Sequence, residues 1–581
     1  MRISHPLHLL LFAILFLASG QQSPGQKATR AERLAASRLE KWESPVREGT
    51  LPELFKIDSI KTDESKKSVE IYFPVTASYN PVREETLSAL VSSVRSTLGK
   101  KFAGYSVTMY SNGFSLERLI PNYFRSALPE DGSRTSPVSG RSPRIISRVG
   151  AVTPEKGLEG RYIALWHSHG YYFDMPLDRW EWQRAKLFGS VEDLSVMAYV
   201  LPYLTPMLEN AGAYVFLPRE RDIQVNEVIV DNDRSTGASR FELQTTGETE
   251  AAGRGFLMKD TLFTGDNPFM EGTSLKITGG SALYVPEIPE KGWYGVTLSY
   301  PNIPGYTGKV SVKVTHTGGV SEFIVDQSLG GGTWLWLGSF LLDAGTDASM
   351  GSVIISGLEG SAALIDAVRF GGGMGNVARR PAESIVSNQW SLNAGSRQGE
   401  AEAAPVAREH SWKISGKPRF VEAARYWLQY AGMPDSTVYS PNRGKNDYND
   451  DYMSRADWVN YLVRKPDSSG AAGMGIPVDL SFAFHTDAGV TPDDSVIGTL
   501  GIYSTITNGG KFPDGTSRLA NRDLTDIVQT QVTEDIKVLF NPDWTRRAMW
   551  DKSYYEARKP DVPAMLLELL SHQNLADQRY G

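Results

Sequence analysis

A change of composition at about Glu227 is the feature that most limits how this chain can fold. From Glu227 to Gly373 the sequence is rich in Gly, Thr, Ser and Val, and short alternating runs such as Lys309–Val314 are separated by turn residues. This pattern is typical of an antiparallel β-sandwich. The flanking segments show buried-type strands and helical repeats instead. We therefore predict an α/β domain with a mainly parallel sheet, interrupted by an all-β insertion, because insertions are tolerated where their two ends lie close together.

The first residues are typical of an export signal. Arg2 precedes an apolar run, Leu9–Ala18, which is about half the length of a membrane span and is followed by small residues. We predict a signal peptide over residues 1–20, and hence a periplasmic or secreted protein with no stable membrane anchor after cleavage. A lipoprotein needs a Cys at the cleavage site, but position 21 is Gln and the chain has no Cys at all. Disulfides are therefore excluded, and any metal must be bound by His and carboxylate groups.

Residues 21–150 are predicted to hold a tether or short helix, a small α/β domain and a linker. Val69–Phe73 and Tyr105–Tyr110 have the pattern of strands, and apolar residues over Leu87–Leu98 recur at helical spacing. Residues 126–150 are rich in Ser, Pro, Gly and Arg, which is typical of a linker. No catalytic residue types concentrate in this region.

Histidine and acidic residues then recur where a strand ends or a helix begins. The apolar run Tyr162–Leu165 leads to a segment with His167 and His169, which strand alternation would place on one face. Glu192 begins a helical pattern that Pro202 and Pro206 are expected to bend.

Two strand patterns far downstream end in the same kinds of residue. Val478–Phe484 leads to His485 and Asp487, and Pro563–Leu567 leads to Glu568. The carboxyl ends of strands are where α/β sheets bind ligands, so we expect these side chains to converge. Two histidines and one carboxylate form a recurring catalytic zinc shell, with a second Glu free to act as a base.

Each of these residues also has a purely structural explanation. A lone His at a strand end is more often a hydrogen-bonded polar residue than a ligand, and a Glu at a helix start usually interacts with the helix dipole. The chain has eight histidines, and two of them lie in the signal region. Finding two of the other six at matching strand ends favours a metal site.

Taken in order, these motifs resemble the zinc-dependent N-acetylmuramoyl-L-alanine amidases of the amidase-3 type. The His169-Gly170 step, the helix-opening Glu192, the pair Arg219 and Asp222, and the segment around His485 match the family's order over about residues 151–226 and 418–581. The resemblance implies that His169, Glu192 and His485 bind Zn²⁺. It implies accessory positions at Arg219 and Asp487, and His167 is a further accessory candidate.

The catalytic residue is also assigned by this resemblance. Leu566, Glu568 and Asn574 match the family's segment around its catalytic Glu, which implies that Glu568 is the general base. Three positions depart from the family: Trp166 stands in place of Asp, Tyr171 in place of Gly, and Asp487 in place of Asn. These differences affect the expected substrate more than the expected metal.

The inserted segment resembles a second family. Trp334–Gly338 and Leu364–Phe370 are similar to the golvesin C-terminal-like domain, which also occurs in proteins described as xanthan lyases. We predict this domain over residues 227–376, between amidase halves at 151–226 and 377–581. The resemblance implies a carbohydrate-facing module. Its tryptophans would stack on sugar rings or belong to the core; they are Trp293, Trp334 and Trp336.

The resemblance to the amidases implies zinc-dependent hydrolysis of the amide between muramic acid and L-Ala in peptidoglycan or a related glycan. The net charge of −7 provides no broad basic face for nucleic acid. Three alternatives stay open. One is a metal hydrolase in which His167 and His169 both bind the metal, another is a polysaccharide lyase, and the third is a non-catalytic wall- or glycan-binding protein.

Overall fold

The computed structural model describes most of the chain in two compact units. The described residues are 28–46, 55–137, 140–152, 154, 157–245, 247–381, 411–466 and 473–580. The predicted signal peptide over residues 1–20 lies outside them. One unit comprises residues 1–78 and 85–117, and the other comprises 79–84 and 118–581. No helix among the described residues is long and apolar enough to cross a bilayer.

The first unit is a small α/β fold. Its elements are α1 (Arg30–Leu39), β1 (Ser59–Asp63), β2 (Ser68–Tyr72), α2 (Glu84–Leu98), β3 (Ser106–Ser111) and β4 (Phe114–Ser115). Strand β2 pairs with β3 in parallel through the α2 crossover, and β1 and β4 add antiparallel edges. Thr29 and Glu32 form a reciprocal capping box that begins α1. The expected strand–helix–strand pattern is therefore confirmed.

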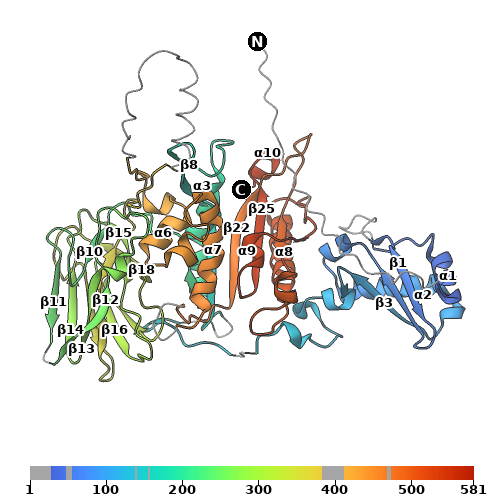
Figure 1. Cartoon of the computed structure of the whole chain (residues 1–581), viewed down its shortest axis with the longest axis horizontal. Coiled ribbons are helices and arrows are strands. Elements are labelled where there is room, and N and C mark those ends of the chain that lie inside the picture. The colour runs from blue at the N-terminus through green and yellow to red at the C-terminus, as the bar shows by residue number, and fades with distance from the viewer. Residues whose placement is uncertain are drawn as a thin grey trace, which may run out of the picture. The chain divides into compact units, whose positions relative to one another are not determined.

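A six-stranded sheet forms the centre of the second unit (Figure 1). Its order is β24 (Trp550–Asp551), β23 (Leu500–Tyr503), β25 (Ala564–Ser571), β22 (Leu480–Asp487), β6 (Tyr162–His167) and β9 (Tyr214–Phe216). The four strands from β25 to β9 are parallel neighbours, whereas β23 runs antiparallel to β25. The expectation that the strands leading to His169, His485 and Glu568 share one sheet is confirmed.

Two of these strands run further than the sequence pattern predicts. Strand β22 continues past His485, and β25 continues past Glu568 to Ser571. His485 and Glu568 are register partners across the two strands. The two side chains therefore lie side by side within the sheet, and not at free strand ends.

Helices cover both faces of this sheet. They are α3 (Glu192–Tyr199), α4 (Thr205–Asn210), α6 (Ala424–Tyr430), α7 (Asp447–Val463), α8 (Leu519–Leu539), α9 (Tyr555–Arg558) and α10 (Leu575–Gln578). Val196 of α3 and Val528 of α8 pack on one face, and Trp458 of α7 belongs to the core on the other. A π-helical turn, Val200–Leu204, separates α3 from α4 at Pro202, so the expected bend is present.

The all-β region is an antiparallel sandwich, as predicted. Its strands are β10 (Val228–Val230), β11 (Arg240–Gln244), β12 (Thr249–Gly255), β13 (Gly272–Ile277), β14 (Ser281–Val285), β15 (Gly292–Leu298), β16 (Lys309–His316), β17 (Gly319–Asp326), β18 (Leu335–Leu342), β19 (Ser352–Gly357), β20 (Ala363–Ile365) and β21 (Val368–Phe370). The first of these pairs with the last, β10 with β21, so the chain enters and leaves the sandwich at one place. This explains how the insertion leaves the α/β sheet intact.

Two features of the sandwich differ from the sequence-based expectation. Strand β5 (Ile146–Arg148), from the segment predicted as a linker, pairs with β17 and extends one of the sheets. In addition, one hydrophobic core runs through the sandwich and one face of the α/β sheet, joining residues such as Trp334 and Trp427. The sandwich is therefore packed against the α/β layer and is not attached by a loop alone.

Candidate metal centre

His169, Glu192 and His485 come together as a buried group. One ligand atom from each lies within 4.8 Å of the other two. The Nδ1 atoms of both histidines are 3.5 Å from Oε1 of Glu192. The three side chains come from the segment after β6, the first residue of α3 and strand β22. This set of two imidazoles and one carboxylate could hold a metal ion.

The turn after β6 directs His169 into this group. Strand β6 ends at His167, and Ser168 has a φ of 50° in the left-handed region. Gly170 is needed next, because a Cβ atom there would lie 2.6 Å from the backbone nitrogen of Ala423. The turn breaks the strand alternation, so the expectation that His167 and His169 share one face is wrong.

His167 is consequently separate from the metal-binding group. It is fully buried, and neither ring nitrogen has a hydrogen-bond partner among the described residues. Burial, with the nearby charges of Arg219 and Arg455, keeps the pKa of His167 well below its ordinary value. The group that could hold a metal contains His169 and not His167, which argues against a site built on both.

Glu192 is held in its ionised form. Burial opposes ionisation, but His485, Arg184 and Ser168 outweigh it and lower the pKa of Glu192. The Ser168 hydroxyl donates to Oε1 at 2.6 Å, and the backbone N–H of Thr486 lies 3.3 Å from the same oxygen. An anionic carboxylate fixed by such donors is suited to binding a cation.

The two histidines have opposite electrostatic surroundings. Burial lowers the pKa of His169 well below its ordinary value, which favours the neutral ring that a metal requires. Burial acts in the same direction on His485, but the carboxylates of Glu556 and Glu192 prevail and raise its pKa to about 9. The acidic environment of His485 attracts positive charge, for which a proton and a metal ion compete.

Glu568 is the carboxyl group of the site that lacks a firm partner. It lines the same cavity, of about 290 Å³, as the three candidate ligands. Its Oε2 atom is buried without a hydrogen bond among the described residues. Burial, aided by the charge of Glu192 and opposed by His485, raises the pKa of Glu568 to about 8. A carboxyl group with one unpaired oxygen beside a candidate metal site is well placed to move protons.

Glu556 and Arg184 were missed in the sequence. Oε2 of Glu556 lies 3.4 Å from Nε2 of His485. Although burial acts against it, the charges of Arg455 and His485 lower the pKa of Glu556 to about 2. Arg184 donates to Nε2 of His169 at 2.9 Å. Neither residue belongs to a motif, since each meets its partner only in the folded chain.

Trp166 is hydrogen-bonded to Glu556. The buried indole N–H of Trp166 donates to Oε1 of Glu556, and both oxygens of this carboxylate lie 3.4 Å from Nε2 of His485. Trp166 therefore supports the carboxylate that faces a candidate ligand. Outer contacts of this kind fix ring orientation in metal sites.

The accessory positions have structural partners. Arg219 is 1% exposed and donates to the backbone oxygens of His167 and Glu422, at 2.7 and 3.0 Å, so it ties the β6 turn to a distant segment. Burial lowers the pKa of Arg219 to about 10. Asp487 lines the cavity, and its Oδ2 lies 2.5 Å from Nη1 of Arg547.

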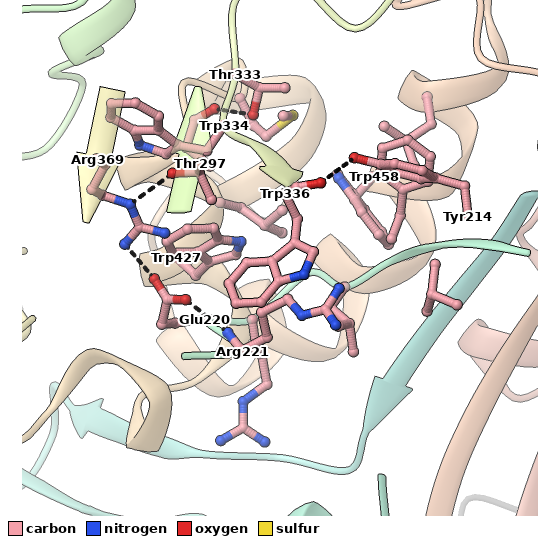
Figure 2. A pocket seen from close by; sticks show the side chains of 18 residues that line it. Tyr214, Glu220, Arg221, Thr297, Thr333, Trp334, Trp336, Arg369, Trp427 and Trp458 are labelled. Atoms are coloured by element: carbon pink, nitrogen blue, oxygen red, sulfur yellow. Dashed lines mark hydrogen bonds and ion pairs between the residues drawn. The ribbon is translucent and has the colours of Figure 1, made fainter. Parts of the chain in front are cut away.

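The tryptophans of the sandwich lie mostly at its junction with the α/β layer (Figure 2). Trp334 is 7% exposed and packs on Phe256 with ring centroids 4.7 Å apart. Trp336 is covered by the guanidinium of Arg221, 4.2 Å above its ring. Trp334 therefore belongs to the core, which is one of the two expected roles, and Trp336 is half-buried beneath Arg221. Trp293 is 63% exposed and stays a candidate.

This junction encloses a small cavity of about 60 Å³. Figure 2 shows Glu220 and Arg369 in contact in the lining of this cavity, and the carboxylate–guanidinium distance is 2.5 Å. The guanidinium carbon of Arg369 also lies 5.0 Å from the centre of the Trp427 ring. This ion pair joins β21 of the sandwich to the segment that follows β9 of the α/β sheet, beside Trp427 of α6.

Comparison with known proteins identifies the sandwich. Residues 263–372 match the golvesin C-terminal domain, which confirms the resemblance found in the sequence. The chain is 31% identical over 153 residues to a xanthan lyase from Bacillus sp. (strain GL1), a match that covers 25% of this chain and 15% of that protein. The chain thus spans less than a sixth of the length of this relative.

Solved structures match the same share of the chain. A xanthan lyase of Paenibacillus is 23% identical, with 25% of this chain and 13% of that one covered and a TM-score of 0.20. The C-terminal CBM6 of the laminarinase LamC from Zobellia galactanivorans is 13% identical, with 25% and 99% covered and a TM-score of 0.16.

Proposed function

We propose that this protein is an exported, zinc-dependent amide hydrolase that cleaves the N-acetylmuramoyl-L-alanine bond of peptidoglycan. The observation that carries the proposal is the buried group of His169, Glu192 and His485. Glu568 lies in β25, the strand next to β22, and lines the same cavity. The order of these residues along the chain resembles that of amidase-3 enzymes. The predicted signal peptide would bring the protein to the compartment that contains this polymer.

The donor set fits zinc. Two imidazoles and one carboxylate, with no thiolate in the chain, match catalytic zinc sites in which three protein ligands leave one position open. When bound, zinc activates water and polarises a carbonyl group. Glu192 supplies the negative charge, and Glu556 orients His485 from behind.

Glu568 moves the proton in this proposal. The oxygen of a water molecule bonds to the amide carbon, and Glu568 takes a proton from that water. Glu568 then delivers the proton to the amide nitrogen as the carbon–nitrogen bond breaks. The products are a lactyl carboxylic acid on the glycan, which then ionises in water, and a peptide with a free L-Ala amino group. Neither His169 nor His485 can perform this transfer while its ring holds a metal.

The sandwich supports a glycan substrate. Its sequence match is to a golvesin domain and to part of a xanthan lyase, and that enzyme acts on a polysaccharide. The same match favours a second candidate function, a glycan-binding protein without catalysis. A polysaccharide lyase is a further alternative with the same support.

Product analysis separates these functions. The full chain, loaded with zinc, is incubated with purified peptidoglycan, and the soluble products are examined by mass spectrometry and ultraviolet absorption. We expect peptides that begin with L-Ala. Products with an unsaturated, ultraviolet-absorbing sugar would show a lyase, and retention on insoluble wall without products would show a binding protein.

Matched variants connect the activity to the site. His169→Ala and His485→Ala should each abolish peptide release and bound zinc. His316→Ala serves as the control, since His316 lies in the sandwich and its Nε2 is 3.1 Å from the Ser321 hydroxyl. Full activity in the His169 or His485 variant would refute the proposed site.

A further inference from the structure

His572 is a buried histidine in the same cavity to which no role has been given. It follows the last residue of β25, is 6% exposed, and lines the cavity with Glu192 and Glu568. Its backbone N–H donates to the oxygen of Asp487 at 2.9 Å, which continues the pairing of β25 with β22. The backbone at this position is therefore fixed by the sheet.

The ring of His572 has an unused polar atom. Nδ1 is buried and has no hydrogen-bond partner among the described residues. Oε2 of Glu192 lies 3.7 Å from this nitrogen, which is too long for a hydrogen bond. Leaving such an atom unpaired costs about 1–3 kcal/mol, so a buried, unpaired group calls for a specific explanation.

The position of Nδ1 separates it from the metal-binding atoms. Oε1 of Glu192 faces His169 and His485, whereas Oε2 faces His572. His572 is not part of the group whose ligand atoms all lie within 4.8 Å of one another. It therefore lies beside the metal-binding group, in the lining of the same cavity.

We propose that His572 is a further catalytic residue, which donates a hydrogen bond from its ring to the carbonyl oxygen of the scissile amide. This inference rests on the proposed amide hydrolysis. As water bonds to the carbonyl carbon, an electron pair moves onto this oxygen and negative charge develops there. The ring N–H of His572 stabilises that charge and keeps its proton. Glu568 carries the only proton that is transferred, and the carbon–nitrogen bond then breaks.

Two substitutions separate hydrogen bonding from packing. His572→Asn places an amide N–H near the position of Nδ1, and His572→Leu fills a similar volume without a donor. Removal of one donor to a developing oxyanion lowers kcat by about 10²–10³-fold. We expect that loss for His572→Leu with little change in KM, zinc content or Tm, and at least partial recovery in His572→Asn. His316→Leu is the control.

A binding measurement makes the test independent of turnover. A phosphinic peptide that mimics the tetrahedral state of an acyl-alanine amide is titrated into the zinc-loaded wild type and each variant. We expect about 10²-fold weaker binding by His572→Leu than by wild type. If wild type binds this mimic but cleaves no amide, the proposed function fails, and the affinity ratio still decides the role of His572.

Three results would overturn the inference. Equal affinity for the mimic in wild type and His572→Leu would show that the ring makes no contact with the oxyanion. Loss of zinc from His572→Leu in proportion to its loss of activity would mean that His572 acts only by positioning Glu192. No binding of the mimic by wild type would overturn both this inference and the proposed function.

Discussion

Glu568 is the residue for which a structural role and a chemical role lead to opposite predictions. Its carboxyl group has a buried, unpaired Oε2 atom, and its surroundings raise its pKa to about 8. Glu568→Gln keeps the size of the side chain but removes its basicity. Since burial already disfavours the charged form, the neutral amide should not lower the Tm.

The expected loss of activity follows from the proton transfer that Glu568 performs. A positioned general base contributes about 10²–10⁴-fold to kcat. This corresponds to about 3–5 kcal/mol of barrier height. The assay is release of peptide from a synthetic muramoyl-L-alanyl peptide, with zinc content and Tm measured on the same samples. Glu359→Gln, at an exposed turn of the sandwich, is the matched control.

Two outcomes would contradict this reasoning. A Glu568→Gln protein that is folded, loaded with zinc and as active as wild type would remove Glu568 from the mechanism. A variant that loses activity only in proportion to lost folded protein would show a structural role.

Three further perturbations test other parts of the site and fold. Arg184→Ala should tighten zinc binding by about fivefold, which corresponds to about one hydrogen bond, because the imidazole of His169 cannot accept from Arg184 while it binds a metal. Equal zinc affinity of this variant and wild type in a chelator competition would argue against this. Glu556→Gln should weaken zinc binding about 10–100-fold in the same assay, through loss of the group that orients His485, and unchanged affinity would refute that role. Replacing residues 227–373 by a short Gly/Ser bridge should lower the Tm, because it uncovers a shared core, and an unchanged melting curve would contradict this.

The sequence was sufficient for the parts of the fold that depend on local patterns. Apolar runs and alternation located the strands that lead to His169, His485 and Glu568, and helical spacing located α2 and the bent helix pair that begins at Glu192. Convergence of these residues followed from the parallel arrangement of strands. The sandwich could be recognised because many short alternating runs are rarely found in any other architecture.

The remaining features depend on contacts between distant segments. No local pattern indicates that Trp166 donates to Glu556 or that Arg184 reaches His169. The left-handed conformation of Ser168 reverses the expected direction of a side chain, and a single residue outside the usual φ range is not visible in an apolar pattern. The sequence indicated an all-β insertion but not its packing, whereas Trp334 is part of a core shared with the α/β layer.

The central claim is that His169, Glu192 and His485 bind one catalytic zinc ion. The most direct measurement is a crystal structure of the zinc-soaked protein with anomalous diffraction data collected on both sides of the zinc absorption edge. The account predicts one strong peak about 2.0–2.2 Å from a donor atom of each of the three residues. Absence of a peak at this position, or a peak bound by His167 instead, would contradict it.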